Sequence, residues 1–201
     1  MSEEFKKPKI TINRVYTGKG DTGYTQLVGG KKVKKNTNRI KGFGEIDELN
    51  VVVGSCALLL NDVDEENKNK LFILILKIQN DLFNLGNMIA TPSDDMVSKM
   101  PQITDKSIKY LEEKINLYNK ELESLTSFVL PGGSELNIRF HYARVVCRRC
   151  ERNIVGILDS ERLDVLIIKY LNRLSDLFFI LSRYANKIAS KNELLWNPNF
   201  K

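Results

Sequence analysis

The sequence from Ile167 to Ile188 reads IIKYLNRLSDLFFILSRYANKI. Its apolar stripe consists of Ile167, Tyr170, Leu174, Leu177, Leu181, Tyr184 and Ile188. These residues recur at steps of three and four, the spacing of one face of an α-helix. A period of 3.5 residues also favours helices that pack nearly aligned with a left-handed twist. The stretch therefore predicts the last helix of a bundle, with Asp159 or Ser160 as its N-cap.

Four stretches upstream show the same periodicity. The first begins near Thr37, and the second ends before Pro92, because a residue that precedes proline avoids helical geometry. The third begins after Thr104 and the fourth after Ser134, both suitable N-caps, the latter following the break Pro131-Gly132-Gly133. The apolar positions are Ile46, Leu49, Val53, Cys56 and Leu60; Leu71, Ile75, Ile78, Leu82, Leu85 and Ile89; Ile108, Leu111, Ile115, Leu117 and Leu122; and Leu136, Phe140, Ala143, Cys147, Cys150 and Ile154. We expect an all-α fold of five helices without strands.

The length and composition indicate one domain. A chain of 201 residues with 42% hydrophobic content can build one substantial core. We expect a single domain over residues 1–201: an ordered Gly/Thr-rich loop region at 1–36, the bundle at 37–190 with a connector at 93–102, and a tail at 191–201 that caps the bundle or is partly disordered.

The sequence also indicates where the protein is located and which kinds of partner it can bind. No apolar run approaches the ~20 residues of a membrane span, so we expect a soluble protein without a membrane partner. The acidic start does not resemble a transit peptide, which predicts a cytoplasmic protein, or a mitochondrial matrix protein if a transit peptide has been removed. The net charge of +6 is spread along the chain and suits an anionic ligand. No nucleic-acid signature accompanies it.

The predicted helix after Ser134 carries a charged face. Arg144, Arg148, Glu151 and Arg152 fall one turn apart on it. Guanidinium groups bind phosphate oxygens through two parallel hydrogen bonds and stay charged, so the face suits an anion site. A solvated outer face with paired charges is the alternative.

The last helix carries a second polar stripe, Asn172, Asp176, Phe179 and Arg183. The side-chain oxygen atoms of Asn172 and Asp176 could bind a ribose or a hydrated Mg²⁺. Alternatively, these residues satisfy one another between helices. For His141, the single histidine, a structural role is favoured over a catalytic one.

Two further motifs have ordinary interpretations as well. The Gly/Thr-rich residues 17–30, followed by Lys32, Lys34 and Lys35, can bind phosphate through backbone N–H groups. The stretch lacks Walker A spacing, and a flexible connector is the alternative. Cys147 and Cys150 have CxxC spacing but lie on the apolar stripe, which favours core packing over redox or metal chemistry.

Three separated blocks resemble one family. They are YTGKGDTGYTQL at 16–27, continuing through Gly29-Gly30 and Lys35 to GEIDELN at 44–50; FVLPGG at 128–133 with ARVVCRRCER at 143–152; and YLNRLSD at 170–176 with Ala185-Asn186. Together they are similar to the ATP:cob(I)alamin adenosyltransferases of the propanediol-utilisation type. Lys32 and Lys41 depart from that pattern, since the family commonly has Arg and Glu there.

The resemblance implies an enzyme that transfers the 5′-deoxyadenosyl group of ATP to cob(I)alamin and releases triphosphate. It implies a homotrimer of five-helix subunits with an active site at each interface. The implied partners are ATP with Mg²⁺, cob(II)alamin and cob(I)alamin as substrate, an electron-donating reductase and a cobalamin-dependent acceptor enzyme.

The resemblance also implies roles for individual residues. Asp47 pairs with Arg144 across the interface, and Phe128 presses on the lower face of the corrin and excludes its axial ligand. These three and Arg148 are the expected catalytic residues, and Asp176 and Phe179 join Asp47, Phe128 and Arg144 at the cobalamin. Mg²⁺ is expected with the phosphates near Glu151 and Asn172, not in a direct protein cage. The expected ATP-binding residues are Thr17, Gly18, Lys19, Gly20, Asp21, Gly23, Thr25, Lys35, Arg148, Glu151, Arg152 and Asn172.

Two other classes of helical protein are rivals to this assignment. A ferritin-like metal bundle needs Glu-x-x-His pairs, and Ile138 occupies the Glu position before the only histidine, His141. A nucleotide-sensing or nucleic-acid-binding helical protein that uses the Arg face without catalysis stays the alternative.

Overall fold

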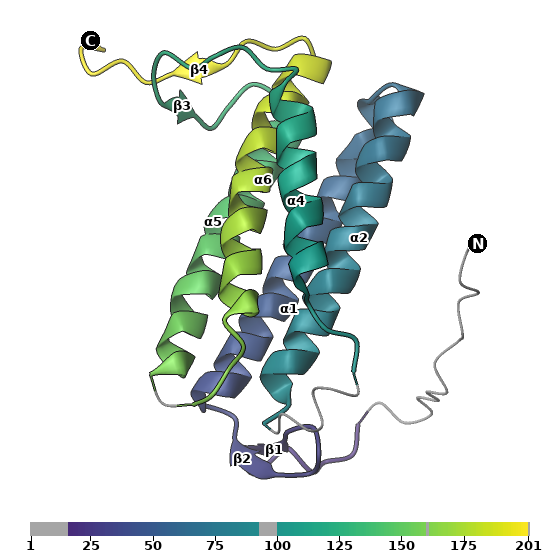
Figure 1. Cartoon of the computed structure of the whole chain (residues 1–201), viewed down its shortest axis with the longest axis vertical. Helices are drawn as coiled ribbons and strands as arrows, with labels where there is room; N and C mark the ends of the chain where they lie inside the picture. The colour runs from purple at the N-terminus through teal and green to yellow at the C-terminus, as the bar shows by residue number, and fades with distance from the viewer. Residues whose placement is uncertain (1–15, 93–99, 160, 201) are drawn as a thin grey trace.

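The computed structural model describes residues 16–92, 100–159 and 161–200. Within them, five α-helices lie nearly aligned along the long axis of the molecule (Figure 1). They are α1 (Asn38–Ala57), α2 (Glu65–Ala90), α4 (Asp105–Asn119), α5 (Glu135–Leu158) and α6 (Leu166–Ile188), and a 3₁₀ turn, η1 (Leu58–Asp62), extends the end of α1. The predicted all-α, five-helix fold is confirmed.

The predicted apolar stripes meet in one core. α5 packs against α6 and α1, α1 against α2, and α4 against α6. Every predicted apolar position of α5 is buried, and Tyr170 and Leu174 of α6 are fully buried. Leu117 is a wrong assignment, since its side chain is 50% exposed, and Leu122 lies beyond the end of α4. None of the described helices has the length and hydropathy to span a bilayer.

Local capping explains where the helices begin. The Ser134 hydroxyl accepts a hydrogen bond from the backbone N–H of Asn137, as the predicted N-cap of α5 should. The Thr104 N–H donates to Ser107 Oγ at the start of α4. Each short polar side chain thus satisfies a backbone group that the first helical turn leaves unpaired.

The predicted start of the last helix was wrong. Asp159 is the C-cap of α5, and Ser160 lies outside the described residues. The helix begins at Leu166, where Asp164 Oδ1 accepts a hydrogen bond from the Leu166 N–H at 2.9 Å. The N-cap position itself is Val165, whose side chain cannot accept a hydrogen bond, so Asp164 pairs the free N–H from one residue earlier.

The expectation of no strands was also wrong in two places. β1 (Tyr24–Gln26) pairs with β2 (Lys32–Lys34), and β3 (Val129–Leu130) pairs with β4 (Leu194–Leu195), both antiparallel. These strands are too short for a visible alternation of apolar and polar residues. The two pairs lie at opposite ends of the bundle (Figure 1). The expected connector at 93–102 falls mostly outside the described residues.

Candidate functional site

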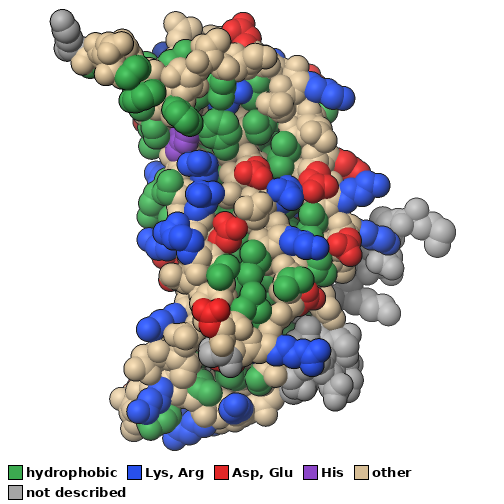
Figure 2. Space-filling model, turned by 60° about the vertical axis from the view of Figure 1, so that its left-hand side comes forward, with side chains coloured by type: hydrophobic (Ala, Val, Ile, Leu, Met, Phe, Trp, Pro, Cys, Tyr) green, Lys and Arg blue, Asp and Glu red, His purple; other side chains and the backbone are tan. Residues whose placement is uncertain are grey.

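The cationic face of α5 is open to a ligand. Arg148 and Arg152 are exposed. Arg152 donates to the Arg148 carbonyl at 3.1 Å, whereas the Arg148 guanidinium has no hydrogen-bond or ion-pair partner within the described part of the chain. Figure 2 shows Lys and Arg side chains gathered below hydrophobic side chains on this side of the molecule. A solvated face of paired charges would have given Arg148 an acidic partner, so the geometry favours an anion site.

Arg144 stands at the boundary between the charged and the apolar part of this face. Its guanidinium carbon lies 5.6 Å from the ring centroid of Phe179 on α6. Burial first, and then the like charge of Arg148, lowers the pKa of Arg144, while Asp176 acts in the opposite direction. Arg144 and Arg148 are therefore close enough for their like charges to interact, and an anion bound beside them would offset that repulsion.

Glu151 and Asn172 join α5 to α6. The Asn172 amide donates to Glu151 Oε1 at 3.2 Å, and Asn172 Oδ1 accepts from Arg173 Nη1 at 3.1 Å. The hydrogen bond between Asn172 and Glu151 supports the interpretation that these polar residues satisfy one another between helices. The same pair also presents carboxylate and amide oxygens beside the cationic face, which supports the ligand-binding interpretation. Oxygens of this kind suit a hydrated Mg²⁺ held mainly by phosphates.

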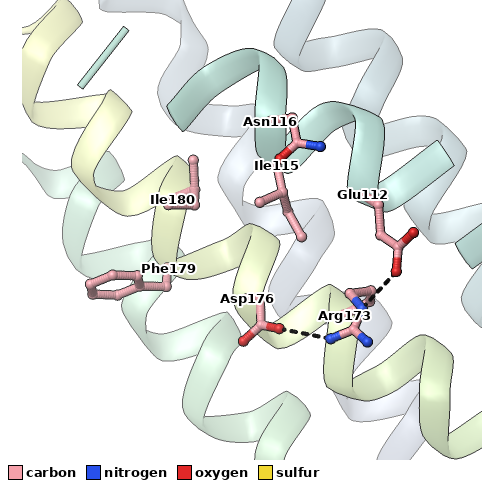
Figure 3. Close-up of a pocket in the computed structure, with 7 residues that line it drawn as sticks. All are labelled: Glu112, Ile115, Asn116, Arg173, Asp176, Phe179 and Ile180. Carbon is pink, nitrogen blue, oxygen red and sulfur yellow. Dashed lines mark hydrogen bonds and ion pairs between the residues drawn. The ribbon is translucent and has the colours of Figure 1, made fainter. Parts of the chain in front are cut away.

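Arg173 was missed as part of this network. It forms ion pairs with Glu112 of α4 at 3.0 Å and with Asp176 at 3.3 Å (Figure 3). A cavity of about 480 Å³ lies beside these groups, with Ile115, Asn116, Phe179 and Ile180 as further lining residues. The sequence offered a signal for Arg173, because it lies in the third of the blocks that resemble the family. It offered none for Glu112, because the spacing of residues in α4 does not distinguish Glu112 from other acidic residues on the surface.

The Gly/Thr-rich loop forms a separate hollow at one end of the bundle. A cavity of about 420 Å³ is lined by Thr17, Lys19, Gly20, Tyr24, Thr25, Gln26 and Lys32. Four of these are expected ATP-binding residues, whereas Tyr24 and Gln26 were missed. Lys32, one of the two departures from the family pattern, places its amino group 4.9 Å from the Tyr24 ring centroid.

Other predicted loop residues shape the hollow without lining it. Gly18 and Gly23 have φ of 68° and 79°, which disfavours any residue with a Cβ. Asp21 donates its N–H to the Gly18 carbonyl at 3.2 Å, and Lys35 donates its own to Gly23 at 2.9 Å. A Cβ on Gly20 would lie 3.0 Å from Lys35 Nζ, so the Lys35 ammonium already approaches the loop backbone.

The expected corrin residues lie apart from the loop within one subunit. Phe128 is 78% exposed beside β3, at the end of the bundle opposite the loop. Asp47 is exposed on α1 and has no hydrogen-bond or ion-pair partner among the described residues. Its neighbour Glu48 is an ion-pair partner of Arg149, which ties α1 to α5.

His141 and the cysteines belong to the interior. His141 is 6% exposed and packs edge-on against Phe179, with ring centroids 6.3 Å apart. Its Nε2 has no hydrogen-bond partner within the described residues. Burial raises the pKa of Cys150 to about 12 and that of Cys147 well above its usual value, and both thiols are free and buried. Core packing of the CxxC pair is confirmed.

Comparison with known proteins bears directly on these features. A sequence profile of the family described as cobalamin adenosyltransferase matches residues 15–185, which include the loop, the α5 face and Asn172. The chain belongs to the cobalamin adenosyltransferase family. This family member is 42% identical over 195 residues to a corrinoid adenosyltransferase of Mycobacterium leprae, covering 94% of this chain and 98% of that protein. It is 32% identical to the human corrinoid adenosyltransferase MMAB, covering 96% and 76% of the two chains.

Solved structures agree with this family membership. One is a Phe-to-His variant of the PduO-type ATP:corrinoid adenosyltransferase from Lactobacillus reuteri complexed with cobalamin and ATP. It superposes with a TM-score of 0.84 at 35% identity and covers 92% of this chain and 97% of its own. An Arg-to-Lys variant of that enzyme, complexed with ATP, superposes with a TM-score of 0.82 at 35% identity and covers 91% of this chain and 100% of its own.

Proposed function

We propose that this protein is an ATP:corrinoid adenosyltransferase that transfers the 5′-deoxyadenosyl group of ATP to cob(I)alamin. In this reaction the electron pair of cobalt(I) forms a bond to C5′, and the C5′–O bond breaks with its electron pair leaving on triphosphate. The observation that carries the proposal is the family match over residues 15–185, which spans both the phosphate-binding features and the apolar end of the site.

The order of groups along α5 fits two substrates laid end to end. Phe179 and Arg144 stand nearer the end that holds Phe128, and Arg148, Glu151 and Arg152 follow toward the opposite end of the helix. Arg144 and Arg152 are eight residues apart, about 12 Å along the helix axis. We assign the apolar end to the corrin and the cationic end to the triphosphate.

Charge stabilisation is the main task of the cationic end. Negative charge grows on the leaving triphosphate, and fixed guanidinium groups aimed at it lower the barrier. Arg148 suits this role because it has no other partner among the described residues. Mg²⁺ bound with ATP would neutralise further phosphate charge, and Glu151 and Asn172 are the residues we propose to hold its hydration shell.

Phe128 performs a different task. An apolar ring on the lower face of the corrin removes the axial ligand, and cob(II)alamin without that ligand becomes four-coordinate and easier to reduce. The 78% exposure of Phe128 leaves its ring available for such contact. Electrons for the reduction would come from a separate reductase, and the product would pass to a cobalamin-dependent enzyme.

A homotrimer completes the site in this proposal. Exposed apolar side chains on α1 and α5, such as Val51 at 70% and Val145 at 51%, favour burial against another copy. The loop of one subunit would then cover ATP bound on the α5 face of its neighbour, with Asp47 meeting the neighbour's Arg144. A cytoplasmic location stays a prediction.

The decisive test is an anaerobic turnover assay with ATP, Mg²⁺ and cob(I)alamin, followed by detection of the alkyl-cobalt product and of triphosphate. We expect stoichiometric formation of both. Tight ATP binding without either product would instead support the nucleotide-sensing alternative.

A further inference from the structure

Two distant chain segments are joined at the Phe128 end of the bundle. Residues 123–130 and 192–196 run beside each other, and we call this pair of segments the strap. Besides the β3–β4 pairing, the Trp196 N–H donates to the Phe128 carbonyl at 2.7 Å, and Ser127 Oγ donates to the Trp196 carbonyl at 2.8 Å. The rings of Phe128 and Trp196 meet edge to face with centroids 6.1 Å apart. The backbone of Phe128 is therefore held by the tail.

A single buried guanidinium anchors both segments of the strap to α6. Arg183 is 4% exposed. Its Nε and Nη2 donate to the two carboxylate oxygens of Glu193 at 2.6 and 3.0 Å, and Nη2 also donates to the Glu123 carbonyl at 2.7 Å. Glu193 belongs to the tail and Glu123 to the segment that leads to Phe128, so one side chain fixes the start of each.

The two segments of the strap are not closely packed along their whole length. A cavity of about 550 Å³ lies between the two segments, with Leu122, Thr126 and Arg183 among its lining residues. The Phe128 ring packs against Trp196, which is itself 47% exposed. Polar contacts to α6 therefore restrain where the strap lies: those of Arg183, the hydrogen bond from the Asn186 amide to the Gly132 carbonyl at 2.8 Å, and that from Lys187 Nζ to the Glu121 carbonyl at 2.8 Å. Of these, only the Arg183 contacts join α6 to both segments of the strap.

We propose that Arg183 and Glu193 are positioning residues. They hold the Phe128 ring at the distance from the lower face of the corrin that is required to displace its axial ligand. This inference rests on the proposed function, because it assigns a cause to the placement of Phe128 in that reaction. Misplacement of a reacting or excluding group by about 1 Å can lower a rate by two orders of magnitude. Loss of Glu193 leaves the Arg183 charge buried without its partner, so the strap would shift to let water reach it.

Glu193→Gln tests the inference, since it removes the charge and keeps the size of the side chain. Glu121→Gln is the matched control: Glu121 also pairs with α6, through Lys187 at 2.9 Å, but both side chains are 45% exposed. The readouts are the fraction of four-coordinate cob(II)alamin formed with Mg²⁺ and ATP, the KM values for cobalamin and ATP, and the Tm. Phe128→Ala gives the lower limit of the four-coordinate signal.

We expect Glu193→Gln to lower the four-coordinate fraction about threefold or more and to raise the KM for cobalamin, while the KM for ATP stays within about twofold. Glu121→Gln should match the wild type. If Glu193→Gln does not fold, Ser127→Ala loosens the strap more gently, and a smaller loss in the same direction is expected.

A wild-type four-coordinate fraction in a folded Glu193→Gln variant, or in Ser127→Ala where Glu193→Gln does not fold, would overturn the inference and leave the proposed function standing. So would a parallel loss of ATP and cobalamin binding, because that is the result of general unfolding. If the wild-type protein itself gives neither the four-coordinate species nor turnover, the proposed function fails instead.

Discussion

Arg148 differs from the other arginines on its face because its guanidinium has no hydrogen bond, ion pair or ring contact within the described residues. Arg144 stacks on Phe179, and Arg152 donates to a backbone carbonyl. A guanidinium without a partner costs side-chain entropy to order and contributes little to folding. Its position is better explained by a bound anion than by stability.

Arg148→Ala should therefore separate activity from folding. We expect kcat to fall at least about 100-fold, the usual loss when one group that stabilises transition-state charge is removed. The free energy of unfolding should change by less than about 0.5 kcal/mol. Arg139→Ala is the control, because Arg139 is an exposed residue of the same helix, nine positions away and so on the opposite face. Near-normal turnover of Arg148→Ala would remove Arg148 from the site.

His141 should make stability depend on pH. Burial first, and then the charge of Arg144, lowers its pKa below the ordinary 6.5, and Glu193 only partly offsets this. The unfolded chain therefore binds a proton more readily than the folded one, so the contribution of His141 is fully present above pH 6.5 and is lost as the pH falls toward the folded-state pKa.

Chemical unfolding of the wild type and His141→Gln across pH 5 to 8 measures this effect. The wild type should lose stability relative to the variant below about pH 6.5, with a slope of at most about 1.4 kcal/mol per pH unit, the limit for one proton. Parallel curves for the two proteins would refute the assignment.

At the scale of elements, a buried polar contact joins α2 to α6. The Tyr170 hydroxyl donates to Asp81 Oδ2 at 3.1 Å, and Asp81 is 5% exposed. Lys77 pairs with the same carboxylate oxygen. The contact satisfies a buried charge between the two helices, where an unpaired carboxylate would be costly.

Tyr170→Phe should lower the free energy of unfolding by about 1–3 kcal/mol, since the carboxylate keeps Lys77 but loses a buried donor. Tyr142→Phe removes a hydroxyl from a 45% exposed ring and should change stability by less than about 0.5 kcal/mol. Thermal unfolding of both variants measures the difference. Equal Tm values would show that the Tyr170 hydroxyl contributes nothing.

The elements also show what sequence reasoning could and could not reach. Helix α5 was predicted from its cap at Ser134 and its apolar stripe because both signals are local. Arg183 was assigned by period to the polar stripe of α6 with Asn172 and Asp176, yet its side chain is buried and pairs with the tail instead. Nothing in the local spacing indicates that Glu193 is its partner. The strands β3 and β4 were missed for the same reason, as each is formed only by pairing with a distant segment.

At the scale of the whole molecule, the proposed trimer depends on a charge pair between subunits. Asp47 and Arg144 lie on different helices and carry opposite charges. Asp47→Arg alone should weaken association by about 2 kcal/mol or more, roughly 30-fold, because like charges then face each other. Combining it with Arg144→Asp should restore the pairing in reverse.

Sedimentation velocity at several protein concentrations gives the oligomeric state of each variant. The double variant should regain assembly more fully than turnover, since Arg144 also stacks on Phe179. A single variant that stays trimeric at all concentrations, or a wild type that is monomeric throughout, would count against this interface.

The strap has a consequence for folding kinetics. Ser127 and Trp196 are 69 positions apart in the chain, and their contact closes a loop that contains α5 and α6. Contacts of such long range form late, after the local structure between them has reduced the cost of closure. A refolding chain should therefore recover helical circular dichroism before it recovers the ability to hold cobalamin in its four-coordinate form.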